Sequence, residues 1–134
     1  MNGVGEDNAG KFLPRVAPID QFGAGGFRFA GMSHLGSLMV LPSGMRAWRP
    51  VAAADIASQD LAGLVAERAA FDFLIIGTGD KMERLPPAVL SFLKAQGIGH
   101  EAMATPAAVH VYNVVVAEGR RVAATLIAIG QGNG

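Results

Sequence analysis

Two short segments hold the hydroxyl and carboxyl groups that could contact a ligand in this 134-residue sequence. Residues 77–80 read Gly-Thr-Gly-Asp after an apolar run, and residues 105–108 read Thr-Pro-Ala-Ala at the expected start of a helix. In parallel α/β sheets, ligands bind beyond the carboxyl ends of the strands, where helix N-termini offer unpaired N–H groups. The two segments therefore predict a small, anion-tolerant crevice, with Thr78 and Thr105 as hydroxyl donors and Asp80 at its rim.

The glycines of the first segment also have a simpler interpretation. Gly77 and Gly79 would permit a sharp turn, and Asp80 would help to cap the structure that follows it. A dinucleotide fingerprint needs a third glycine where Met82 stands, and the segment does not match a phosphate-binding P-loop. We therefore predict no nucleotide cofactor, and no other cofactor is indicated.

Metal binding and serine-based catalysis have no support in the sequence. His34, His100 and His110 are too far apart to match a metal-ligand spacing, so no metal site is predicted. No Gly-x-Ser-x-Gly motif marks an activated serine. On a helix, His110 would share a polar edge with Asn113, either as a base of tuned pKa or as a core histidine bonded to a neighbour.

Composition excludes several other classes of function. The 11 basic and 11 acidic residues cancel, so the electrostatic field that gathers nucleic acid is missing. There is no cysteine, which excludes disulfides and cysteine-ligated metals. The most apolar stretches, 109–117 and 122–129, are shorter than the roughly 20 residues that cross a bilayer. We expect a cytoplasmic protein without a targeting signal or transmembrane segment, and a homo-oligomer is compatible with this composition.

The order of apolar segments predicts one α/β domain over residues 15–130, between flexible tails at 1–14 and 131–134. Glycine-punctuated apolar groups over 15–48 indicate an antiparallel β meander. The second half alternates helices and strands, as in a mostly parallel sheet. Its expected elements are a helix after residue 56 with Ser58 as N-cap, a strand at 71–76, a helix after Pro86-Pro87, a strand at 100–104, a helix at 106–118 and an interior strand at 122–129.

Several segments together resemble a known family. They are Gly25-Gly-Phe27, Gly36-Ser-Leu-Met-Val-Leu-Pro42, Leu74-Ile-Ile-Gly-Thr-Gly79, Thr105, Ala107-Ala108, Tyr112-Asn-Val114 and Ala117-Glu-Gly-Arg-Arg-Val-Ala123. From about Gln21 to Ile129 the chain is similar to the uncharacterised family that includes mitochondrial respiratory complex I assembly factor three and the adipogenesis-associated domain protein. The resemblance implies a three-layer α/β sandwich with a central mixed sheet.

The resemblance carries over no catalytic residue, because the family has no established enzymatic mechanism. Its motifs match positions that become candidates for ligand contact, namely Gly77, Thr78, Gly79, Thr105, Tyr112 and Asn113. Two positions depart from the pattern, since relatives often have an acidic residue where Ala104 stands and an arginine where His110 stands.

The sequence therefore supports two functional hypotheses. The first is a non-catalytic protein-interaction or assembly factor, peripheral to a membrane complex such as respiratory complex I, with an unidentified protein partner. The alternative is a small-ligand or anion-binding domain, or a cryptic enzyme, that uses the crevice between residues 77–80 and 105–108.

Overall fold

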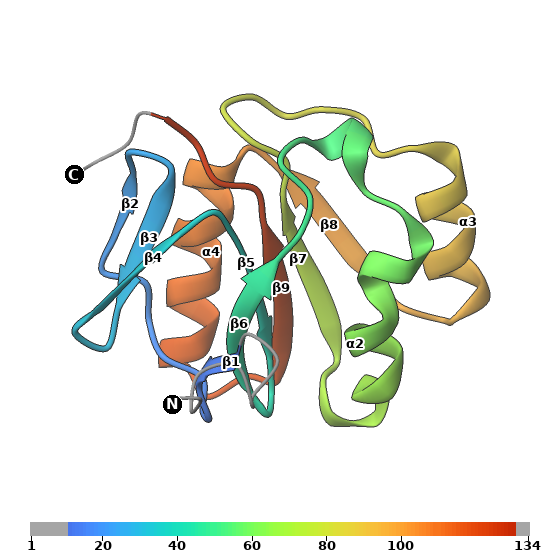
Figure 1. The fold of residues 1–134 in the computed structure, drawn as a ribbon. Helices are drawn as coiled ribbons and strands as arrows, with labels where there is room; N and C mark the ends of the chain where they lie inside the picture. Colours follow the sequence, from blue (N-terminus) through green and yellow to red (C-terminus); the bar gives the residue numbers. More distant parts are fainter. Residues whose placement is uncertain (1–10, 131–134) are drawn as a thin grey trace, which may run out of the picture.

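The computed structural model describes residues 11–130, which form three layers (Figure 1). A six-stranded sheet is the central layer. Helix α4 (Thr105–Ala117) and a small three-stranded sheet cover one face, while α2 (Ala62–Ala66) and α3 (Pro87–Ala95) cover the other. The predicted fold class, a three-layer α/β sandwich with a central mixed sheet, is confirmed.

The predicted tails are only partly described. Residues 1–10 and 131–134 lie outside the described residues. Within the predicted tail over 1–14, Lys11–Leu13 forms strand β1 and pairs antiparallel with β6 (Gly44–Trp48). This part of the chain therefore belongs to the edge of the central sheet.

The central sheet has the strand order β1-β6-β5-β9-β7-β8. Its remaining strands are β5 (Ser37–Leu41), β7 (Phe73–Gly77), β8 (His100–Met103) and β9 (Val122–Leu126). Strand β7 pairs in parallel with β9 and β8, and the other pairings are antiparallel. Fewer of the strand pairings in the central sheet are parallel than predicted, because the β5–β6 hairpin joins this sheet and does not stay in a separate meander.

The rest of the predicted meander forms the small sheet, from strands β2 (Gln21–Gly23), β3 (Gly26–Phe29) and β4 (Met32–Leu35). Each hairpin has a two-residue loop in which both residues have positive φ. That geometry matches a type I′ turn, which suits the twist of antiparallel strands. The sequence reading did not anticipate β4, whose side chains are only partly buried.

The helices of the second half fall close to their predicted positions. Helix α4 begins at Thr105, one residue before the prediction, and its N-cap residue is Ala104. Ser58 is not an N-cap, because it lies inside a short 3-10 helix (Ser58–Leu61) that precedes α2. No helix among residues 11–130 is long and apolar enough to cross a membrane.

The two faces of the central sheet bury separate apolar clusters. Phe29, Val40 and Tyr112 belong to the cluster on the α4 side. Leu41, Leu64 and Leu93 belong to the cluster on the α2 and α3 side. Strand β9 is buried along its whole length, which confirms the predicted interior strand although it ends at Leu126. Strands β7 and β9 pair in parallel with Gly77 opposite Leu126, so their carboxyl ends lie side by side.

Candidate functional site

A crevice of about 420 Å³ opens at the carboxyl ends of β7 and β9. We call it the switch-point crevice. Three loops line it: Val51, Ala52, Ala53 and Ala54 after β6; Thr78, Gly79, Asp80, Lys81, Glu83 and Arg84 after β7; and Ile127, Ala128, Ile129 and Gly130 after β9.

The crevice exists because the chain leaves two neighbouring parallel strands in opposite directions. After β7 the chain runs to α3 on one face of the sheet (Figure 1). After β9 it turns to the small sheet, where the carbonyl of Ile129 accepts from the N–H of Gly25 (2.8 Å) and that of Gly130 accepts from Ala24 (3.0 Å). Such a topological switch point is where open α/β sheets bind ligands.

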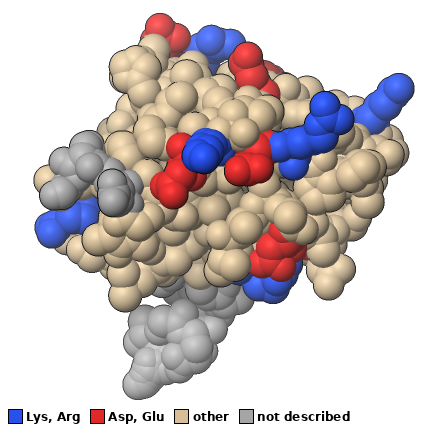
Figure 2. Space-filling model, turned by 90° about the horizontal axis from the view of Figure 1, so that it is seen from above, with Lys and Arg blue, Asp and Glu red and all other residues tan. Residues whose placement is uncertain are grey.

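Charges of both signs surround this end of the molecule. Asp80, Lys81, Glu83 and Arg84 are exposed, and none of them forms an ion pair within residues 11–130. Figure 2, which looks down on the molecule from above the view of Figure 1, shows acidic and basic side chains interspersed. No patch of a single sign dominates this face.

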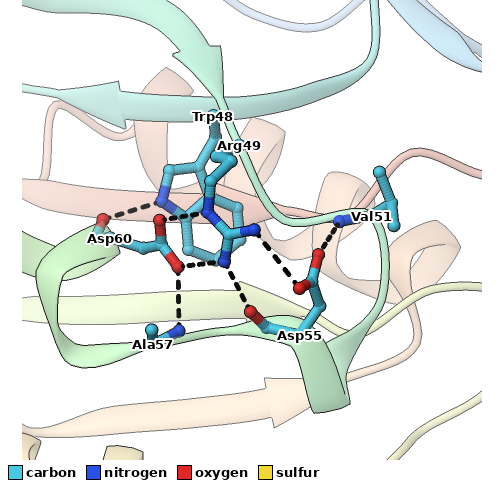
Figure 3. A network of polar contacts seen from close by, with 6 residues as sticks. All are labelled: Trp48, Arg49, Val51, Asp55, Ala57 and Asp60. Carbon is cyan, nitrogen blue, oxygen red and sulfur yellow. Dashed lines mark hydrogen bonds and ion pairs between the residues drawn. The ribbon is translucent and has the colours of Figure 1, made fainter.

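Arg49 anchors the loop after β6 (Figure 3). Its guanidinium donates two hydrogen bonds to the carboxylate of Asp60, at 2.8 and 2.6 Å. It also donates to the carboxylate (3.2 Å) and the backbone carbonyl (2.6 Å) of Asp55. The other carboxylate oxygen of Asp55 accepts from the N–H of Val51 (3.1 Å). The network therefore fixes the wall formed by residues 51–54.

The same contacts shift the acidity of both carboxyl groups. The Arg49 guanidinium, helped by the N–H of Ala57, lowers the pKa of Asp60 despite the partial burial of that group. The N–H of Val51 and then the Arg49 side chain lower the pKa of Asp55. Both groups are ionised at neutral pH, so the network is charged and intact under those conditions.

The two predicted hydroxyl donors are buried and bonded to the backbone. Thr105 donates to the carbonyl of Ile127 (2.7 Å) and accepts from the N–H of Gly79 (3.0 Å). Thr78 donates to the carbonyl of Lys81 (2.8 Å) and accepts from the N–H of Glu83 (2.9 Å). Both hydroxyls hold the loops of the crevice together.

Gly77 makes this close approach possible. A Cβ at Gly77 would lie 2.9 Å from the hydroxyl oxygen of Thr105 and 3.0 Å from a methyl of Leu126. Gly79 has φ +118°, a backbone conformation that side chains disfavour. Gly79 therefore fits the sharp-turn interpretation, whereas Gly77, the last residue of β7, is explained by the close approach of Thr105.

The three candidates on α4 lie away from the crevice. Tyr112 is fully buried, and its hydroxyl donates to the carbonyl of Ala17 (2.7 Å). The side-chain amide of Asn113 accepts from the N–H of Ile19 and donates to its carbonyl, each at 2.8 Å. We call Ala17, Ile19, Tyr112 and Asn113 the α4 clamp. Burial raises the pKa of the Tyr112 hydroxyl, so it stays protonated. His110 is exposed.

The structure thus brings only some of the predicted residues together. Thr78, Gly79 and Asp80 line the crevice, whereas residues 105–108 do not. Thr105 instead bonds to the backbone of two lining residues, Gly79 and Ile127. The loops at 51–54 and 127–130 were not anticipated. Their signal was weak, because alanine and isoleucine are ordinary core residues. Among residues 11–130, no three histidine or acidic side chains cluster in a way that could hold a metal ion.

Relatives in sequence extend across most of the chain. An uncharacterized protein of Rhodobacter capsulatus is 37% identical over 110 residues, which cover 82% of this chain and 83% of that protein. The mouse NADH dehydrogenase [ubiquinone] 1 alpha subcomplex assembly factor 3 is 31% identical over 115 residues. That match covers 86% of this chain but only 62% of the mouse protein, so this chain spans about three fifths of the assembly factor.

Solved structures with the same fold include several bacterial proteins. A crystal structure described as an outer membrane protein of Bartonella henselae matches with a TM-score of 0.83 and 40% identity, covering 88% of this chain and 99% of that one. A Mth938-like domain of Bordetella pertussis matches with a TM-score of 0.70 and 29% identity, covering 84% and 85%. A family model also matches residues 19–127. The chain therefore belongs to the family described as "Protein of unknown function (DUF498/DUF598)".

Proposed function

We propose that this chain is a non-catalytic assembly factor that binds a protein partner during assembly of a respiratory NADH dehydrogenase at a membrane. The observation that carries this proposal is the 31% identity to the mouse assembly factor over 86% of this chain. Because the chain spans only 62% of that relative, the proposal concerns the shared domain alone.

The polar chemistry of the fold supports a non-catalytic role. Thr78, Thr105 and Tyr112 are buried hydroxyl residues, and each donates to a backbone carbonyl. A nucleophile or general base needs a neighbour that activates it and an open approach for the substrate. Within residues 11–130 the partners of these three hydroxyls are backbone groups that hold the fold together, so no neighbouring side chain activates them.

Exposed apolar side chains on three elements are suitable contacts for a protein partner. Leu35 on β4 is 80% exposed, Val114 on α4 is 44% exposed and Val65 on α2 is 37% exposed. Val65 also lines a shallow groove between α2 and α3, whose lining is uncharged and includes Ala62 and Phe92. Interface cores are depleted in charged residues, which is consistent with this composition.

A deletion strain tests the proposal. We expect membranes from cells that lack this chain to contain less assembled NADH dehydrogenase on native gels and to oxidise NADH more slowly. A plasmid copy of the chain should restore both. Normal amounts of active enzyme in the deletion strain would refute the assembly role.

Three variants then locate the surface that binds the partner. Leu35→Glu, Val65→Glu and Val114→Glu each place a charge on a different exposed element, and such surface changes have little effect on folding. Ala88→Glu, at an exposed position of α3, is the matched control and should complement fully. We expect one of the three variants to fail in complementation while its circular dichroism and melting temperature stay normal. Full complementation by all three would contradict an apolar contact at these faces.

A further inference from the structure

The switch-point crevice combines an apolar floor with a charged rim. Ala53, Ile127 and Ile129 are buried beneath it, with exposed fractions of 3%, 2% and 6%. Its volume of about 420 Å³ falls within the range of about 300–1,000 Å³ that is usual for small-molecule pockets. Val51, which is 77% exposed, adds an accessible apolar side chain to the lining. The space therefore fits a small organic ligand that has an apolar part.

The walls of the crevice are fixed before any ligand arrives. Arg49 holds the wall at 51–54 through Asp55 and Asp60 (Figure 3). Thr105 joins the loops after β7 and β9, since its hydroxyl bonds to backbone groups of both. A preformed site loses less conformational entropy when it binds a ligand than a mobile one does.

The charges of the rim restrict the ligand class. Asp80 and Glu83 would attract a cationic group, and Lys81 and Arg84 would attract an anionic one. A ligand of a single sign would meet two like charges, whereas a dipolar ligand can place each of its ends near an opposite charge. The buried hydroxyls of Thr78 and Thr105 already have backbone partners, so these four charged side chains supply the recognition.

We propose that the switch-point crevice binds a small zwitterion with an apolar body, either a free apolar amino acid or a short peptide with both termini charged. Its ammonium group lies toward Asp80 and Glu83, and its carboxylate lies toward Lys81 and Arg84. The apolar side chain packs against the exposed side chain of Val51. This binding is independent of the assembly role, because it rests on the crevice alone and is measured on the isolated chain.

Titrations of the ¹⁵N-labelled full chain test the ligand class. The probes are L-leucine, the dipeptide leucyl-phenylalanine and its N-acetylated, C-amidated form, which lacks both terminal charges. We expect amide shifts to change at residues 51–54, 78–84 and 127–130, and to saturate with leucine or with the free dipeptide. The capped dipeptide should bind about fivefold more weakly or worse, because it loses both ion pairs. Which free probe saturates first distinguishes an amino-acid site from a peptide site.

Two results would overturn the proposal. One is the absence of saturable shifts at these three loops with both free probes at millimolar concentration. The other is equal affinity for the capped and the free dipeptide, since apolar contact alone would then explain the binding.

Charge-removing variants test the orientation of the ligand. The probes are the free dipeptide and two forms with one cap each, one only C-amidated and one only N-acetylated. We expect the double variant Lys81→Gln, Arg84→Gln to bind the free dipeptide about two- to fivefold more weakly, and to bind the C-amidated form as the wild type does. Asp80→Asn with Glu83→Gln should have the reverse selectivity, sparing the N-acetylated dipeptide. Arg28→Gln, an exposed charge on the small sheet, is the control and should change neither. The assigned orientation would be contradicted if each double variant weakened binding of the two singly capped dipeptides equally, or if neither double variant weakened binding of the free dipeptide.

Discussion

Polar side chains occupy two contrasting settings in this molecule, the α4 clamp and the switch-point crevice. In the clamp, the buried hydroxyl of Tyr112 and the amide of Asn113 bind backbone groups of Ala17 and Ile19. In the crevice, Lys81 and Arg84 are exposed to solvent. A buried polar group must find a partner within the protein, whereas an exposed one can exchange its water for a ligand.

Thr105 shows that this contrast follows burial and not position. It lies at the base of the crevice, yet its hydroxyl is fully buried and bonds to two backbone groups, as the residues of the clamp do. Its role is therefore to hold together the two strand ends from which the crevice opens. Removing its hydroxyl tests the contrast most severely.

The largest effect is expected for Thr105→Val. Valine keeps the shape of threonine but leaves the carbonyl of Ile127 and the N–H of Gly79 without a partner in a buried site. Each orphaned group costs about 1–3 kcal/mol, so we expect the free energy of unfolding to fall by about 2–4 kcal/mol. Urea denaturation followed by circular dichroism measures the loss.

Thr105→Ser is the matched control, because it keeps the hydroxyl and removes only a methyl group. Its cost should be about 1 kcal/mol, the value of one buried methylene-sized group. If Thr105→Val were no more destabilising than Thr105→Ser, the hydroxyl would not be holding the strand ends.

A smaller loss is expected in the α4 clamp for Tyr112→Phe. The change removes one hydrogen bond and leaves the carbonyl of Ala17 unpaired, so the free energy of unfolding should fall by about 1–2 kcal/mol. The amide exchange rate should rise more, relative to wild type, in β2 and β3 than in β7, because the clamp attaches the chain that leads into the small sheet. Uniform acceleration across both sheets would mean that the clamp has no local role.

Much of the fold could be predicted from the sequence because its signals are local. The Pro86-Pro87 pair marks the start of α3, and the continuous apolar run around Ile75 marks a strand buried on both faces. The division of the meander into two sheets could not be predicted. It depends on which strand pairs with β9, and that long-range choice leaves no mark in the glycine spacing of the hairpins.

The candidate site was predicted only in part, for the same reason. The position of residues 78–80 follows from the general rule that ligands bind at the carboxyl ends of parallel strands. The wall at 51–54 could not be foreseen, because Arg49 meets Asp60 only after the chain has folded back across 11 positions. Ligand contact stays a prediction for every predicted site residue, namely Gly77, Thr78, Gly79, Asp80, Thr105, His110, Tyr112 and Asn113.

A small gain in stability is expected for Ala30→Asn in the loop between β3 and β4. Ala30 has φ +50°, a left-handed conformation that asparagine adopts more readily than alanine. We expect the free energy of unfolding to rise by about 0.5 kcal/mol, measured by urea denaturation. Ala66→Asn, at an exposed position of α2, is the control and should lose about the same amount through its weaker helix propensity. Destabilisation by both variants would show that the turn tolerates alanine without strain.

The last effect is expected for Arg49→Gln. Its guanidinium and the Asp55 carboxylate are exposed, so their ion pair contributes little, whereas the Asp60 side chain is only 6% exposed and keeps the N–H of Ala57 as a donor. The effect has a distinctive pH dependence. Asp55 and Asp60 have lowered pKa values in the folded chain, so their ionic contribution is present above about pH 4 and is lost as pH falls through those values. The gap in melting temperature between wild type and Arg49→Gln should therefore be widest near neutrality and close in acid. Arg28→Gln, which removes a charge outside the network, should show no such closing gap. A gap that stayed constant from neutral to acidic pH would mean that the wall at 51–54 is held by packing and not by the charges of the network.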